Sequence, residues 1–329
     1  MEALSTWTKR SAFVLIVSLV LHGAAAHAGA GYRTKNFAVD APTPALAKEI
    51  GDLAEKYRKE LAVEWLGKEL PQWAQPCPIK AQVAPNLGAG GATVFVFDRG
   101  EVFGWRMNIQ GSRERILDSV LPHEITHTIF ACHFRQPLPR WADEGACTTV
   151  EHRSEIAKQE NLLITFLQTR KGIPFDAMFK MKEYPPEVLP LYAQGHSLAQ
   201  FLISQYGKQA FLGFLADGLT DENWPRAIQK TYGYRDLMTL QNSWLGWVKD
   251  GRPQLQLASN PAQRAPVVKQ VSTPTVVRGQ DPGPQTGGDQ WSSVVSVTPT
   301  RSSGDELQNA NQPVGPSVYE ALSSGQLRR

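Results

Sequence analysis

The sequence predicts an α+β fold in which a small N-terminal sheet packs against a helix-rich region. Short runs that are rich in β-branched and aromatic residues are concentrated in residues 29–110 and are bounded by glycine-containing turns. From residue 111 to residue 250, apolar residues instead recur at spacings of three and four, which is the period of an amphipathic helix. A block of strands followed by a block of helices is typical of α+β proteins.

The composition is that of a globular protein, and its charges exclude one class of partner. The chain has 329 residues, of which 42% are hydrophobic and 20% are charged, so it can bury a sizeable core. Its formal net charge is only +3, and residues of both signs are interspersed without a basic stripe. Because nucleic-acid binding needs such a stripe, we expect no nucleic-acid partner.

Residues 1–28 have the pattern of a secretory signal peptide. Two basic residues precede an apolar run at residues 12–21, and the small residues Ala26 and Ala28 then offer a cleavage site. The run is too short for a permanent membrane span, although an uncleaved anchor is the alternative interpretation. No later stretch is apolar enough to span a bilayer. We therefore expect a secreted or periplasmic protein with no stable membrane span after signal cleavage.

Within residues 29–110, the pattern predicts one long helix and several strands. Residues 44–67 carry apolar side chains at helical spacing. The turn signal NLGAGG precedes the last two strand runs, and the sequence DRG separates them. The predicted strands cover residues 32–39, 78–84, 92–97 and 102–109.

The rest of the chain divides into helices and a tail. Ser112 is the predicted N-cap of the first helix, and the helical period is clearest in residues 198–219 and 237–248. After residue 250 the composition shifts to Pro, Gln, Ser, Thr and Gly. Such a segment cannot bury enough apolar surface to offset chain entropy, so we expect residues 251–329 to form a disordered tail.

Three cysteines permit one disulfide. An exported protein folds in an oxidising compartment, where disulfides persist. A bond between Cys132 and Cys147 would close a loop of a size that stabilises by on the order of 3 kcal/mol, so this is the predicted pair. The alternative is that these two cysteines and Cys77 are all reduced and simply buried in the core.

The segment LPHEITHTIF contains the spacing His-Glu-x-x-His. Helix positions i and i+4 differ by about 40° around the axis, so His123 and His127 can direct two imidazoles at one ion. Glu124 then lies beside that ion rather than on it. This position suits a general base for a metal-activated water.

Pro122 restricts where this helix can begin. A proline in a helix interior removes a hydrogen bond and kinks the helix, whereas a proline in the first turn does no harm. We therefore expect a helix that begins near Val120 and is capped by Asp118 or Ser119.

A catalytic zinc usually takes three protein ligands, so a third must come from elsewhere in the chain. Glu144, in the segment RWADEGACTTVE, is the candidate. Pro137 and Pro139 end the first helix and turn the chain back. Two helices joined in this way can present His123, His127 and Glu144 to one Zn²⁺ ion.

The sequence HEITH followed by WADEGACTTVE resembles the gluzincin metallopeptidases, in particular the aminopeptidase-N-like and related peptidase-MA-like group. Trp141, Glu144, Gly145 and Glu151 match the family pattern in register, whereas Asp143 replaces the usual Asn. The resemblance implies a thermolysin-like zincin catalytic region. It also implies a Zn²⁺ cofactor and the hydrolysis of a peptide or protein substrate.

Two further residues receive roles. Glu151 lies seven residues after Glu144 and therefore on the same side of a helix, where it can accept a hydrogen bond from a zinc-bound His; a solvated carboxylate is the alternative. The segment LYAQGHSLAQ is similar to the family's Tyr-x-x-Gly segment. The similarity implies that Tyr192 stabilises the oxyanion of the reaction, and a half-buried core aromatic is the alternative.

The resemblance also implies a substrate-binding edge strand just before the His-Glu-x-x-His helix. Residues 103–111, FGWRMNIQG, occupy that place in the sequence. They lack the glutamate with which aminopeptidases of the family bind a free amine, so exopeptidase and endopeptidase activity both stay open.

The prediction is therefore a secreted zinc-dependent metallopeptidase in which Glu124 takes a proton from the attacking water. An exported, non-catalytic binding or scaffold protein that retains the gluzincin fold is the alternative function. Zinc binding without hydrolysis of any peptide would favour this alternative.

Overall fold

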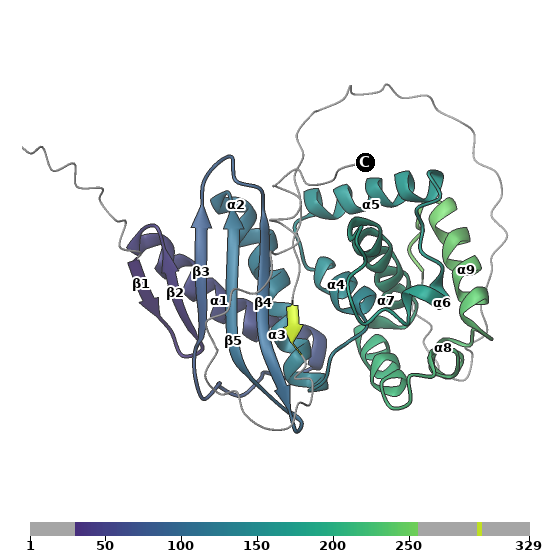
Figure 1. Cartoon of the computed structure of the whole chain (residues 1–329), viewed down its shortest axis with the longest axis horizontal. Coiled ribbons are helices and arrows are strands. Elements are labelled where there is room, and N and C mark those ends of the chain that lie inside the picture. The colour runs from purple at the N-terminus through teal and green to yellow at the C-terminus, as the bar shows by residue number, and fades with distance from the viewer. Residues whose placement is uncertain (1–29, 256–294, 298–329) are drawn as a thin grey trace, which may run out of the picture.

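A computed structural model describes residues 30–255 and 295–297 of the chain. A sheet with its covering helices forms one side of the molecule, and helices α4 to α9 form the other (Figure 1). This arrangement confirms the predicted α+β class. The predicted signal peptide, residues 1–28, and most of the predicted tail, residues 251–329, lie outside the described residues.

Among the described residues, six strands form one mixed sheet in the order β1-β2-β3-β5-β4-β6. β1 with β2 and β4 with β5 are antiparallel, and the other three neighbouring pairs are parallel. The strands are β1 (Ala30–Arg33), β2 (Phe37–Ala41), β3 (Cys77–Val83), β4 (Gly90–Asp98), β5 (Glu101–Gly111) and β6 (Val295–Val297).

The predicted strand at residues 32–39 is in fact two strands. The backbone of Thr34 donates a 2.9 Å hydrogen bond to the carbonyl of Phe37, which turns the chain from β1 into β2. The backbone and side-chain nitrogens of Asn36, in this turn, donate to the Glu55 carboxylate at 2.6 and 2.7 Å. The sequence concealed the turn because it contains neither Gly nor Pro.

β4 and β5 form a hairpin whose turn lies at the predicted DRG segment. Arg99 and Gly100 are the two turn residues, with φ of 49° and 78°, which matches the type I′ geometry that suits the twist of antiparallel strands. β5 pairs with β3 on its other side, so β5 is an interior strand. The expectation that residues 103–111 form a substrate-binding edge strand is therefore wrong. The strand of the hairpin that lies toward the outer edge is β4.

Helix α1 (Pro44–Leu66) spans almost the whole predicted range and covers one face of the sheet. Thr43 caps its N-terminus by accepting from the backbone of Leu46, and Gly67 ends it with a φ of 72°. Trp65 of α1 packs edge to face against Phe130 of α3 (Leu121–Phe134), with 4.9 Å between ring centroids. α3, which carries the His-Glu-x-x-His segment, is thereby fixed to the layer that covers the sheet.

The entry into α3 differs from the prediction. Ser112 caps a continuous helical segment as expected, accepting from the backbone of Arg115. The segment begins with α2 (Arg113–Arg115) and continues through the π-helical turn η1 (Ile116–Val120). Caps at Asp118 or Ser119 are therefore wrong, because both residues lie inside η1. The π-helical turn η1 ends two residues before Pro122. A proline has no backbone N–H and therefore cannot donate an α-helical hydrogen bond.

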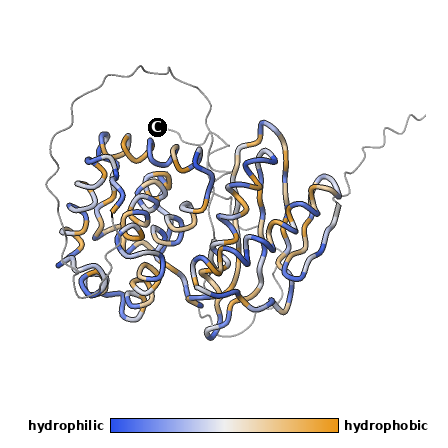
Figure 2. Tube along the Cα trace, turned by 180° about the vertical axis from the view of Figure 1, so that it is seen from behind, coloured by the Kyte–Doolittle hydropathy of each residue, from blue (hydrophilic) through white to orange (hydrophobic). Residues whose placement is uncertain are grey.

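The second side of the molecule is made of helices. α5 shows alternating hydrophilic and hydrophobic bands, as an amphipathic surface helix should (Figure 2). None of the helices within the described ranges is long and apolar enough to cross a membrane. The helices are α4 (Arg140–Thr148), α5 (Arg153–Gln168), α6 (Phe175–Met178), α7 (Leu189–Gly218), α8 (Trp224–Tyr232) and α9 (Leu237–Lys249).

The predicted disulfide is absent. Cys77, Cys132 and Cys147 are all free thiols; Cys77 and Cys147 are buried, as the alternative interpretation had it, whereas Cys132 is only partly buried. Cys132 accepts a hydrogen bond from the indole nitrogen of Trp73 at 3.4 Å, whereas the sulfur of Cys147 lies 3.3 Å from Nδ1 of His127. Cys132 and Cys147 thus have different neighbours and do not form a disulfide with each other.

Candidate metal centre

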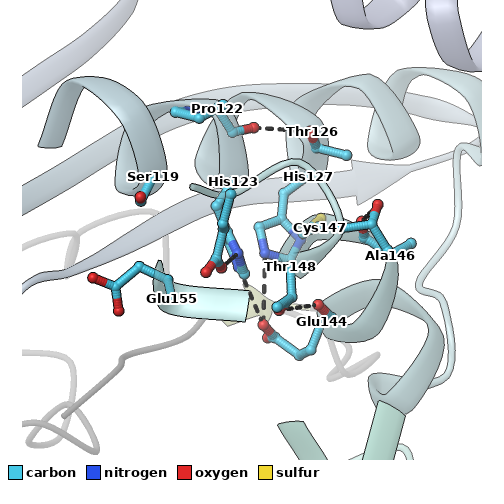
Figure 3. Close-up of polar contacts among 12 residues, drawn as sticks. Ser119, Pro122, His123, Thr126, His127, Glu144, Ala146, Cys147, Thr148 and Glu155 are labelled. Atoms are coloured by element: carbon cyan, nitrogen blue, oxygen red, sulfur yellow. Dashed lines mark hydrogen bonds and ion pairs between the residues drawn. The ribbon is translucent and has the colours of Figure 1, made fainter. Parts of the chain in front are cut away.

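The two histidines of α3 and the glutamate of α4 converge on one point. His123 and His127 are one turn apart on α3, and both rings point toward Glu144 (Figure 3). Oε2 of Glu144 lies 3.4 Å from Nε2 of His123 and 3.7 Å from Nε2 of His127. The three side chains are at most 3% exposed. The structure therefore brings together the three predicted metal ligands.

The atoms at this point fit a tetrahedral cation. Nε2 of His123, Nε2 of His127 and Oε2 of Glu144 are all buried, and none of the three has a hydrogen-bond partner. Buried polar atoms without partners are costly, so their convergence calls for a ligand. Zinc bonds of 2.0–2.1 Å in a tetrahedron separate neighbouring donor atoms by about 3.3 Å. The observed separations are close to that value.

Cys147 offers a second possible donor set. The ligand atoms of His123, His127 and Cys147 all lie within 4.8 Å of one another, so this buried group could hold a metal ion. However, the sulfur approaches Nδ1 of His127, and that nitrogen already has a carboxylate partner in Asp143 at 2.9 Å. A metal on this side would also leave Oε2 of Glu144 without a partner. The geometry therefore favours Glu144 as the third donor.

Each histidine is oriented through its other ring nitrogen. Oε1 of Glu151 lies 2.6 Å from Nδ1 of His123, and Oδ1 of Asp143 lies 2.9 Å from Nδ1 of His127. A carboxylate at Nδ1 keeps the proton there and directs the lone pair of Nε2 toward the metal. Glu151 thus makes the predicted contact with a ligand histidine, although α4 ends at Thr148 and Glu151 lies beyond the helix. Asp143 had been noted only as a departure from the family pattern.

The local charge favours a cation between α3 and α4. Burial alone lowers the pKa of the His123 imidazole, but the carboxylates of Glu144 and Glu151 beside its two ring nitrogens outweigh burial and raise that pKa well above its ordinary value. Burial and neighbouring carboxylates raise the pKa of Glu151 to about 7, although its bond to His123 opposes the shift. The carboxylates around the two histidines therefore favour a positive charge at this point, which a bound metal ion would supply.

Glu124, the predicted base, is held by strand β4. Oγ1 of Thr93 donates a 2.6 Å hydrogen bond to Oε2 of Glu124. A Cβ atom added at Gly91 would lie only 2.4 Å from Oε1 of Glu124, so the strand can approach the carboxylate this closely only with glycine there. Burial raises the pKa of Glu124, which His127 and His123 partly oppose. The carboxyl group is thus oriented by residues that the sequence analysis did not select.

A tyrosine that the sequence analysis did not select contacts the centre. Oη of Tyr184 donates a 2.5 Å hydrogen bond to Oε1 of Glu144. The guanidinium of Arg140 lies 4.5 Å from the centre of the Tyr184 ring. Tyr192 is buried on α7 and stacks parallel to Tyr184 with 6.5 Å between centroids. Tyr192 is therefore next to the tyrosine that touches the third ligand.

Helix α4 owes its position to a close crossing with α7. A Cβ atom at Gly145 would lie 2.3 Å from the backbone carbon and oxygen of Gly195. A Cβ atom at Gly195 would lie 2.6 Å from the carbonyl oxygen of Trp141. Only glycine at both positions permits this contact, and Glu144 is the residue directly before the crossing point. The crossing therefore sets how far Glu144 reaches toward α3.

Comparison with known proteins identifies no relative of the chain. No protein-family model, curated protein or solved structure matches it. The function must therefore be inferred from the geometry and chemistry of the residues themselves.

Proposed function

We propose that this protein is a zinc-dependent metallopeptidase-like hydrolase of the gluzincin type, with a thermolysin-like catalytic region. The observation that carries the proposal is the convergence of three buried donor atoms without partners, on His123, His127 and Glu144, beside a buried carboxylate on Glu124. Two imidazoles and one carboxylate are the donor set of several catalytic zinc sites, in which the fourth position stays open. Because residues 1–28 are predicted to be a signal peptide, we propose that the protein acts outside the cytoplasm.

Zinc held by this donor set supplies Lewis acidity toward a substrate carbonyl and lowers the pKa of water. Glu124 is the general base: it is next in sequence to a ligand and is held by Thr93. Glu151 and Asp143 hold the ligand imidazoles in the tautomer that presents Nε2.

The two tyrosines have different proposed roles. Tyr184 holds Oε1 of Glu144, so Oε2 is the oxygen left to bind the metal. Tyr184 is therefore a positioning residue. Stabilisation of the oxyanion by Tyr192 remains a prediction from the sequence resemblance; Tyr192 stacks on the ring of Tyr184.

The decisive experiment combines metal content with activity in the full chain. Purified protein is expected to contain about one zinc per chain and to cleave members of an internally quenched peptide library. The substitution Glu124→Gln is expected to retain zinc and to lower kcat by at least about a hundredfold. The exposed Glu60→Gln variant controls for loss of a charge. Full activity of the Glu124→Gln variant would disprove the proposed role of the base.

Burial of the centre favours a second candidate function, a binding or scaffold protein with a structural metal. The three donors and Glu124 are all at most 3% exposed, and structural zinc sites are closed. A structural site has no use for a base beside the metal. This function therefore predicts bound zinc but no cleavage of any library peptide by the parent chain. Peptides with free and blocked amino termini, tested in parallel, would also separate exopeptidase from endopeptidase activity.

A further inference from the structure

The short strand β6 pairs with the outer edge of β4. The register is parallel and places Val94 opposite Val295, Phe95 opposite Ser296 and Val96 opposite Val297. β6 comes from the region after residue 250, far along the chain from the rest of the sheet, and Figure 1 shows it beside β4. Without β6, β4 would be the last strand of the sheet and would expose a row of backbone donors and acceptors.

The same strand carries the residues that hold the proposed base. Gly91 and Thr93 of β4 contact Glu124, and Val94, the first residue paired with β6, directly follows Thr93. Neighbouring strand residues are about 3.3 Å apart, so the edge taken by β6 begins within one residue of the contact with the base. Any extended chain that pairs with this edge is therefore delivered next to the proposed catalytic carboxylate.

The pairing of β6 is the smallest in the sheet. It covers three residues of β4, whereas the opposite edge of β4 pairs with β5 at positions along its whole length from Gly90 to Asp98. β6 can consequently leave without disturbing the other strands.

We propose that residues 295–297 are a built-in competitor for the peptide-binding edge of β4. Only one extended segment can pair with that edge at a time, since each backbone group of the edge is used once. Because β6 belongs to the same chain, its pairing is intramolecular, so even a weak three-residue pairing competes with substrate. The proposal rests on the proposed function for the identity of the displaced peptide, but the pairing itself is independent of catalysis.

The test weakens β6 in the full chain while leaving the metal centre unchanged. The paired substitutions Ser296→Pro and Val297→Pro remove two adjacent backbone donors. Since alternate residues of a strand donate to a given neighbour, one of the two removes a bond to β4. The matched control carries Ser296→Thr and Val297→Thr, which keep both donors and favour strand structure. The first measurement is hydrogen exchange at the amides of residues 94–96.

Faster exchange at residues 94–96 in the proline variant, but not in the threonine variant, is expected. With a cleavable library peptide, the proline variant is expected to show a KM lower by about threefold or more with kcat unchanged, because its edge is free more often. A synthetic peptide of residues 291–300, WSSVVSVTPT, is expected to inhibit the proline variant competitively and more strongly than the threonine variant.

The failures of the two proposals can be distinguished. Unchanged exchange in the proline variant, or faster exchange with an unchanged KM, overturns the competition. If neither variant cleaves any peptide, the proposed function fails and the competition is judged by binding alone. Fluorescence anisotropy of labelled WSSVVSVTPT then decides: tighter binding to the proline variant supports the competition, and equal binding to both variants overturns it.

Discussion

Thr93 of β4 and Glu124 of α3 are joined by a buried hydrogen bond of 2.6 Å. The bond connects the sheet to the helix that carries both histidines, and it holds one oxygen of the proposed base. The other oxygen lies over Gly91, where no Cβ atom would fit. The position of the base is thus set by a strand that is distant from it in sequence.

The first prediction concerns this bond. Thr93→Val keeps the shape of the side chain but removes the hydroxyl, so Glu124 loses a fixed orientation. We expect kcat to fall by about tenfold, which corresponds to about 1.4 kcal/mol of transition-state stabilisation, with zinc content unchanged. Thr93→Ser retains the hydroxyl and is expected to keep most of the activity. An unaltered kcat in Thr93→Val would show that the bond does not orient the base.

The ligands were predictable from sequence because their arrangement is local. His123 and His127 share one face of a helix by their spacing alone, and Glu144 follows after one proline-rich turn. The contact of Glu151 with His123 was also predicted, but the reason given for it was wrong, because α4 ends at Thr148 and Glu151 lies beyond the helix. The inferences for His123, His127 and Glu144 use only separations along the chain, and the structure brings these three side chains to one point.

The residues that support the site were missed because they depend on contacts between distant segments. Tyr184 lies in the loop before α7 and belongs to no periodic pattern. The sequence also could not reveal whether β4 or β5 lies outermost, since a hairpin can add to a sheet by either strand. Thr93 did leave a signal: it shares a face with Phe95 and Phe97, and a polar residue on such a face needs a buried partner.

The second prediction separates the two possible donor sets. Glu144→Ala removes an oxygen that lies near Nε2 of both histidines, so we expect zinc affinity to fall by at least about a hundredfold. Cys147→Ser leaves that oxygen in place and is expected to retain one zinc per chain. Metal content after dialysis against a graded chelator measures both. Loss of zinc from Cys147→Ser, with retention in Glu144→Ala, would identify the thiol as the third ligand.

The third prediction concerns the carboxylates that orient the histidines. Glu151→Ala and Asp143→Ala each remove the partner of an Nδ1 nitrogen, and we expect zinc affinity to fall by about 10- to 100-fold in each variant. Asp143→Asn restores an oxygen that can accept from Nδ1 of His127, so its effect is expected to be much smaller. If Asp143→Asn were as damaging as Asp143→Ala, the negative charge rather than the hydrogen bond would be the important property.

The final prediction tests whether the crossing of α4 and α7 positions Glu144. In Gly145→Ala the new methyl group would lie 2.3 Å from the backbone of Gly195, which no side-chain rotation can relieve. The helices must move apart, at a cost of about 3 kcal/mol in the free energy of unfolding. Gly213→Ala, on α7 where nothing lies within 4 Å of the added atom, is the control and is expected to be neutral or slightly stabilising. Denaturant unfolding measures stability, and zinc affinity in the folded protein reports the position of Glu144. We expect both to fall in Gly145→Ala, because the displaced α4 carries Glu144 away from the histidines; a loss of stability with unchanged zinc affinity would show that the crossing supports only the fold.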